Sequence, residues 1–151
     1  MRKLRKLLAL PPGRVGSLFM ATALLALARW KHAHQSISEL IEEIKLPINL
    51  NGRVNAEYAA TVAWALRTAA TVVPWRADCL VCAIAARNWA EKLGLPFEFH
   101  LGVSLGSTGE LEAHAWSLSG TTFLSGNIRE ISRFREFDFE QFSAFKLKFS
   151  E

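Results

Sequence analysis

The chain has few cysteines and few aspartates. Its two cysteines, Cys79 and Cys82, lie three residues apart, and a disulfide between them would close almost no loop and add little stability. This excludes a disulfide-built secreted scaffold, so we expect a reducing, cytoplasmic location. The only aspartates are Asp78 and Asp138, which leaves few carboxylates of the kind that orient a catalytic histidine.

The chain also has no apolar run long enough to span a bilayer. The stretch SLFMATALLALA, residues 17–28, is shorter than the roughly 18–20 residues that a membrane span needs. Pro11, Pro12 and Gly13 separate it from the basic start of the chain, unlike a signal peptide, where the two adjoin. We therefore expect a buried or surface-docking helix here.

No acidic residue occurs in residues 1–38. This stretch holds seven cations: Arg2, Lys3, Arg5, Lys6, Arg14, Arg29 and Lys31. Such a basic end is typical of contact with an acidic peptide, a membrane surface or a nucleic acid, or of a solvated tail. Cations and aromatics do not alternate along a strand, so nucleic acid is not favoured. A membrane contact through the basic N-terminal helix remains open.

Several motifs are absent as well. The chain has no GxGxxG, P-loop or HExxH pattern, and no second cysteine pair to complete a zinc site. The Cys79–Cys82 spacing is that of a redox CxxC, but the βαβ context of that motif is missing. We therefore predict no metal and no cofactor.

The apolar pattern indicates helices followed by strands. We predict helices over residues 15–32, 36–46, 56–73 and 79–93, with Ser36, Asn55 and Asp78 as N-caps and Gly94 as a C-terminal stop. From residue 97 the period changes to two, which predicts strands over residues 97–104, 111–118 and 121–125, and a further one over 142–149. His100 is expected to point outward. The order predicts an α+β fold, with N-terminal helices followed by an antiparallel sheet.

We divide the chain into an N-terminal helical region, residues 1–50, and a core, residues 51–151, which pack as one compact domain.

Cys79 is the strongest candidate for chemistry. It falls on the first residue of a predicted helix, where free amides and the helix dipole favour a thiolate and can bind an oxyanion. Cys82 fits a core position better.

His114 is the matching candidate base. It lies in a predicted strand, 35 residues after Cys79, between two small alanines. An imidazole beside the thiol can accept its proton and later protonate a leaving amine. For the group that orients this imidazole we favour Asn127 over Asp138, and a backbone carbonyl is the third possibility. Trp75 and Trp116 are candidates to line the cleft.

These motifs resemble a known family. Pro-Trp-Arg before Cys79-Leu80, an alanine-rich helix ending at Gly94, and His114-Ala115-Trp116 are similar to the lasso-peptide biosynthesis B proteins. These are leader peptidases with a transglutaminase-like, papain-like cysteine protease core. The likeness covers about residues 55–127, and the basic start is similar more loosely.

The resemblance implies a function and partners. It implies a thiol protease that removes the leader of a ribosomally made, modified precursor peptide, with Cys79 as nucleophile and His114 as base. Ser125-Gly126-Asn127 stands where the family often has an aspartate. The implied partners are the precursor peptide, a separate leader-recognition protein and a lasso cyclase. The alternatives are a transglutaminase-like acyl transferase and a non-enzymatic adaptor that docks on a membrane or partner.

Overall fold

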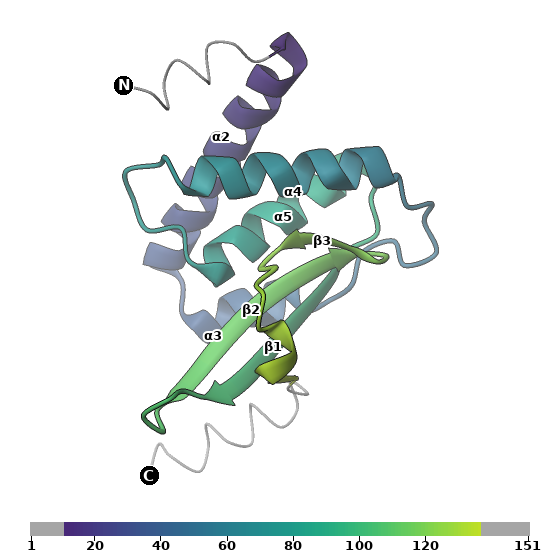
Figure 1. Cartoon of the computed structure of the whole chain (residues 1–151). Helices are drawn as coiled ribbons and strands as arrows, with labels where there is room; N and C mark the ends of the chain where they lie inside the picture. The colour runs from purple at the N-terminus through teal and green to yellow at the C-terminus, as the bar shows by residue number, and fades with distance from the viewer. Residues whose placement is uncertain (1–10, 137–151) are drawn as a thin grey trace.

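Four helices precede the sheet in the computed structural model, which describes residues 11–136 (Figure 1). They are α2 (Pro12–His34), α3 (Ile37–Ile44), α4 (Ala56–Ala70) and α5 (Cys79–Leu93). The predicted strand over residues 142–149 and Asp138 lie outside the described residues.

The predicted caps of the helices are confirmed. Ser36 forms a capping box with Glu39, since its hydroxyl accepts from the Glu39 amide at 3.3 Å and the Glu39 carboxylate accepts from the Ser36 amide at 2.8 Å. Asn55 caps α4, and Gly94 ends α5 with a φ of 65°. The starts of α3, α4 and α5 therefore follow from local side-chain hydrogen bonds.

The end of α4 was predicted wrongly. The pattern extends α4 to Pro74, whereas the helix ends at Ala70. The residues between are Thr71, Val72 and Val73, whose branched side chains are poor helix formers, and the residue before a proline avoids the helical region. The chain turns here toward the start of α5.

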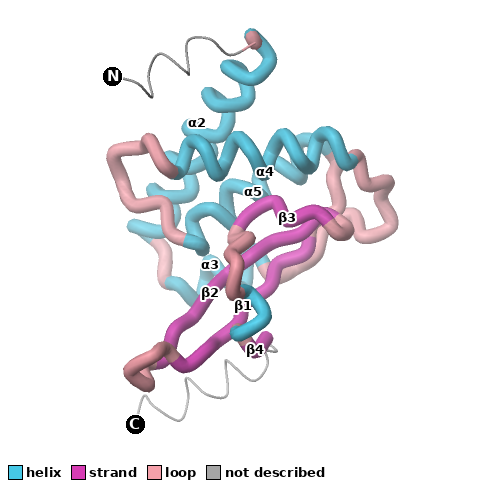
Figure 2. Tube along the Cα trace, in the orientation of Figure 1, coloured by secondary structure: helices cyan, strands magenta, loops and turns pink. Residues whose placement is uncertain are grey.

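The sheet is antiparallel with strand order β3-β2-β1-β4, as Figure 2 shows. Its strands are β1 (Glu98–Leu105), β2 (Leu111–Ser119), β3 (Thr122–Ser125) and β4 (Arg135–Glu136), with a short 3₁₀ helix, η1 (Ile131–Arg133), before β4. Ser119-Gly120 turns β2 into β3, as expected. The sequence pattern did not predict β4, which pairs with Gly102 and Val103 of β1. The predicted α+β fold is confirmed.

One hydrophobic core joins the helices to the sheet. Alternate residues of the strands, Phe99 and Leu101 on β1 and Ala115 on β2, pack with buried residues of α2, α4 and α5. In Figure 1, α3 and α5 lie behind the sheet and η1 lies in front of it. The face of the sheet that carries His114 is therefore the face turned toward η1. Every helix between residues 11 and 136 is too short or too polar to cross a membrane.

Candidate active site

Cys79 is the first residue of α5. Asp78 caps the helix, since its carboxylate accepts from the Val81 amide at 3.0 Å. The side chain of Cys79 is half-buried against the core. Because the first-turn amides of a helix lack intrahelical partners, an oxyanion formed at this sulfur would meet free N–H groups. The predicted position of Cys79 at the start of this helix is confirmed.

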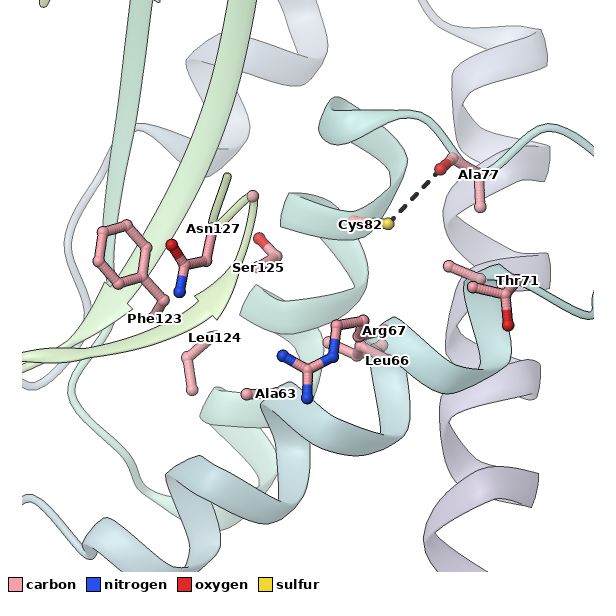
Figure 3. Close-up of a pocket in the computed structure, with 12 residues that line it drawn as sticks. Ala63, Leu66, Arg67, Thr71, Ala77, Cys82, Phe123, Leu124, Ser125 and Asn127 are labelled. Carbon is pink, nitrogen blue, oxygen red and sulfur yellow. Dashed lines mark hydrogen bonds between the residues drawn. The ribbon is translucent and has the colours of Figure 1, made fainter. Parts of the chain in front are cut away.

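Cys82, one turn later, is a different kind of thiol. Burial, then the nearby Asp78 and Cys79, raise its pKa to about 12. Its sulfur donates weakly to the Ala77 carbonyl at 3.7 Å, the dashed contact in Figure 3. Cys82 therefore stays protonated at neutral pH and is a poor nucleophile.

His114 lies on β2 with one ring nitrogen engaged. Its Nε2 is 2.7 Å from the main-chain carbonyl oxygen of Gly126. A carbonyl only accepts, so Nε2 carries the hydrogen and Nδ1 keeps the lone pair. The nitrogen available as a base is therefore Nδ1. Among the alternatives for the orienting group, a backbone carbonyl occupies this place, and Asn127 is the next residue along the chain.

Trp116 lies between two imidazoles. Its ring stacks with His100 at a centroid distance of 5.6 Å and with His114 at 6.2 Å, and Phe134 contacts His114 at 5.3 Å. Trp116 is only 8% exposed. Its indole therefore packs the imidazole of His114 in place and offers little surface to a substrate.

His100 points away from the helical core, as predicted. It also makes contacts that the sequence did not indicate: Trp116 stacks on it, its Nδ1 pairs with the Glu136 carboxylate, and its Nε2 is buried without a partner among the described residues. The pair fastens β4 to β1 beside the His114 site. One residue in the sequence could have indicated this close packing. Gly102 is a glycine in the interior of a strand, and a Cβ at this position would lie 3.0 Å from the Trp116 ring.

Trp75 stands in the loop before Cys79. It is half-buried and packs against the core, and its indole Nε1 is buried without a hydrogen-bond partner in the described part of the chain. Trp75 therefore lies close to Cys79 along the chain, but its indole nitrogen faces the protein interior.

A pocket of about 380 Å³ lies between α4, α5 and β3, with Asn127 in its wall (Figure 3). The wall also holds Gly126, which binds His114, and Cys82 and Ala77, which flank Cys79 in the sequence. The remaining lining residues are Ala63, Leu66, Arg67, Ala70, Thr71, Phe123, Leu124 and Ser125. The cavity thus adjoins segments that carry both candidate catalytic residues.

The structure brings some candidates together and leaves others apart. His114, Trp116 and the Gly126-Asn127 segment form one neighbourhood. The Cys79 sulfur makes no hydrogen bond within residues 11–136, to His114 or to any other group. Catalytic hydrogen bonds are often long or unformed before substrate binds. No cluster of three or more metal-ligating side chains occurs in the same residues.

Comparison with known proteins identifies a family. A family model described as the transglutaminase-like superfamily matches residues 20–137, which is most of the chain. No curated protein and no solved structure matches the chain.

Proposed function

The chain belongs to the transglutaminase-like superfamily, and on that premise we propose that it is a cysteine peptidase that removes the leader from a lasso-peptide precursor. Members of the superfamily are typically cysteine-dependent enzymes and include peptidases and acyl transferases. The narrower assignment is supported by the motifs around Cys79 and His114 that resemble the leader peptidases. We place this activity in the cytoplasm, with a leader-recognition protein and a lasso cyclase as partners.

The observation that carries the proposal is the position of Cys79. It occupies the first turn of a capped 15-residue helix, while the neighbouring Cys82 is a neutral, partly buried thiol. A nucleophile needs a reachable sulfur next to groups that stabilise negative charge, and of these two cysteines only Cys79 has that setting.

The proposed reaction has two steps. Nδ1 of His114 accepts the Cys79 proton, and the sulfur attacks the carbonyl carbon at the leader–core junction. The α5 amides hold the oxyanion, the C–N bond breaks, and His114 returns the proton to the departing core amine. His114 then takes a proton from water, which attacks the thioester and releases the leader acid and the thiol. The cyclase would use the freed amine.

Mass spectrometry of a precursor incubated with the protein and its leader-recognition partner tests this function. We expect two fragments whose masses sum to the precursor plus one water. Cys79→Ala should abolish cleavage and keep precursor binding, whereas Cys82→Ala, the matched control, should keep cleavage. Full activity of Cys79→Ala would rule out the proposal.

The acyl transferase alternative is an outcome of the same experiment. It shares the thioester and differs in the second step, where an amine replaces water. With a primary amine such as cadaverine present, a product that gains the amine in place of water would favour transfer over hydrolysis.

A further inference from the structure

The pocket between α4, α5 and β3 carries one positive charge at its rim. Arg67 of α4 is the one charged residue among those that line it, and the other walls are apolar or neutral. Cys82 adds no charge, because its pKa of about 12 keeps it a thiol. The cavity therefore combines a largely apolar, uncharged wall with a single positive group at its rim.

Arg67 has no partner of its own. Arg67 is exposed at the rim of the pocket, and its guanidinium makes no hydrogen bond or ion pair to any residue that the structure describes. Figure 3 shows it extending from α4 toward β3, on the side of Leu124 and Asn127. A free guanidinium presents a planar set of donors that matches a carboxylate.

We propose that this pocket binds a part of the substrate that has an apolar body and a carboxylate end, with Arg67 as the selecting residue. This rests on the proposed function. Because Gly126 lines the pocket and its carbonyl binds His114, an occupant would lie beside the segment that orients the imidazole. A glutamate side chain near the cleaved bond has this chemistry, and a lysine side chain would be rejected by like charge.

The test measures binding to the full-length Cys79→Ala protein, so no turnover is required. The probes are hexanoate, hexanol and hexylamine, titrated by NMR with the alanine methyl groups as reporters. We expect hexanoate to bind at least 10-fold more tightly than hexylamine. Arg67→Gln should weaken hexanoate binding at least 10-fold, and Arg67→Lys should recover part of that lost affinity.

Arg53→Gln is the matched control, because Arg53 is an exposed arginine outside the pocket. It should leave hexanoate binding unchanged. The proposal would be overturned if the three probes bound equally or if hexanoate did not bind. It would also be overturned if Arg67→Gln bound hexanoate as tightly as the unchanged chain. Failure here leaves the Cys79 cleavage test untouched, so the two proposals can fail separately.

A second, independent feature is the exposed side of α2. Phe19 and Trp30 are 76% and 59% exposed, and Met20 and Leu27 are exposed too. At about 100° per residue these four side chains fall within one sector about 100° wide. The opposite side of α2 packs in the core. An apolar stripe of this kind on the outside of a helix marks an interaction surface.

The charge beside this stripe identifies its partner. α2 contains no acidic residue, and residues 1–10, which lead directly into it, contain four cations and no acid. Aromatic side chains on a basic helix are the pattern of a helix that lies in a membrane interface. We infer that the exposed side of α2 binds an anionic lipid surface.

Vesicle sedimentation tests this inference on the full chain. We expect binding to vesicles of phosphatidylcholine with phosphatidylserine, weaker binding at high salt, and little binding to phosphatidylcholine alone. Phe19→Ser with Trp30→Ser should reduce binding at least 10-fold. Val72→Ser with Leu105→Ser removes two exposed apolar side chains elsewhere and should have no effect. No sedimentation, or a dimer that the first pair of changes dissociates, would overturn the inference.

Discussion

The imidazole of His114 donates its Nε2 hydrogen to the main-chain carbonyl of Gly126 at 2.7 Å. Gly126 has a φ of 73°, a conformation that favours glycine, and a Cβ there would lie 2.3 Å from the Ala115 carbonyl oxygen. A glycine at this position thus lets the chain pass close enough to β2 to orient the ring and fix its tautomer.

This hydrogen bond predicts which substitution in residues 126–127 lowers the cleavage activity. Gly126→Ala should displace the carbonyl and lower kcat/KM for precursor cleavage at least 10-fold. Asn127→Ala leaves the carbonyl in place and should lower kcat/KM much less than Gly126→Ala does. Steady-state cleavage assays on both variants check this, after circular dichroism confirms folding. A large loss in Asn127→Ala alone would instead assign the orienting role to its amide.

The two cysteines should differ in alkylation. Iodoacetamide at pH 8 should modify Cys79 in the folded protein and leave Cys82 intact, because burial and the Asp78 charge raise the Cys82 pKa to about 12. Peptide mapping by mass spectrometry after a short exposure measures both sites. In urea both should react. Equal modification of the folded protein would contradict the two distinct thiol environments.

The same pKa gives a pH dependence of stability. The folded-state pKa of Cys82 is raised above the ordinary thiol value of 9.0, so the unfolded chain loses this proton more readily. The contribution of Cys82 to stability is complete below about pH 9 and is lost as pH rises toward 12. Urea unfolding between pH 8 and 11 should show a steeper loss for the natural chain than for Cys82→Ala. Parallel curves would contradict this.

The cap of α5 should couple stability to activity. Asp78→Ala removes the acceptor of the Val81 amide and should cost about 1 kcal/mol in the free energy of unfolding. It also loosens the helix turn that carries Cys79, so cleavage should fall. Asn55→Ala removes the equivalent cap of α4, accepting from Tyr58, and should cost similar stability while cleavage is kept. Equal cleavage by both variants would show that the cap is structural only.

Local features of the sequence predicted much of this structure. The caps at Ser36, Asn55 and Asp78 each depend on a side chain that bonds within three residues, so a single segment determines them. The alternating apolar residues of β1 and β2 likewise predicted strands and the face that packs on the helices.

Long-range relationships were not predictable in the same way. The carbonyl of Gly126 carries no side-chain signature, and its role depends on a contact across 12 residues. The two-residue strand β4 is too short to show a period, and it is held by the pairing of Glu136 with His100. These contacts exist only once the sheet has formed. The sequence pattern therefore predicted Cys79 and His114 as catalytic candidates but did not identify the Gly126 carbonyl or the Glu136–His100 pair that lie around His114.

The close approach at Gly102 is the last testable contact. A Cβ there would lie 3.0 Å from both the Trp116 ring and the Phe134 Cβ, and neither neighbour is a flexible chain end. Gly102→Ala should therefore cost about 1–3 kcal/mol in thermal unfolding and disturb the ring stack beside His114. Gly16→Ala on α2, where a Cβ meets nothing within 4 Å, should raise stability through helix propensity. If both changes stabilised the protein, Trp116 would not be packed against β1 as described, and the orientation of His114 would need another cause.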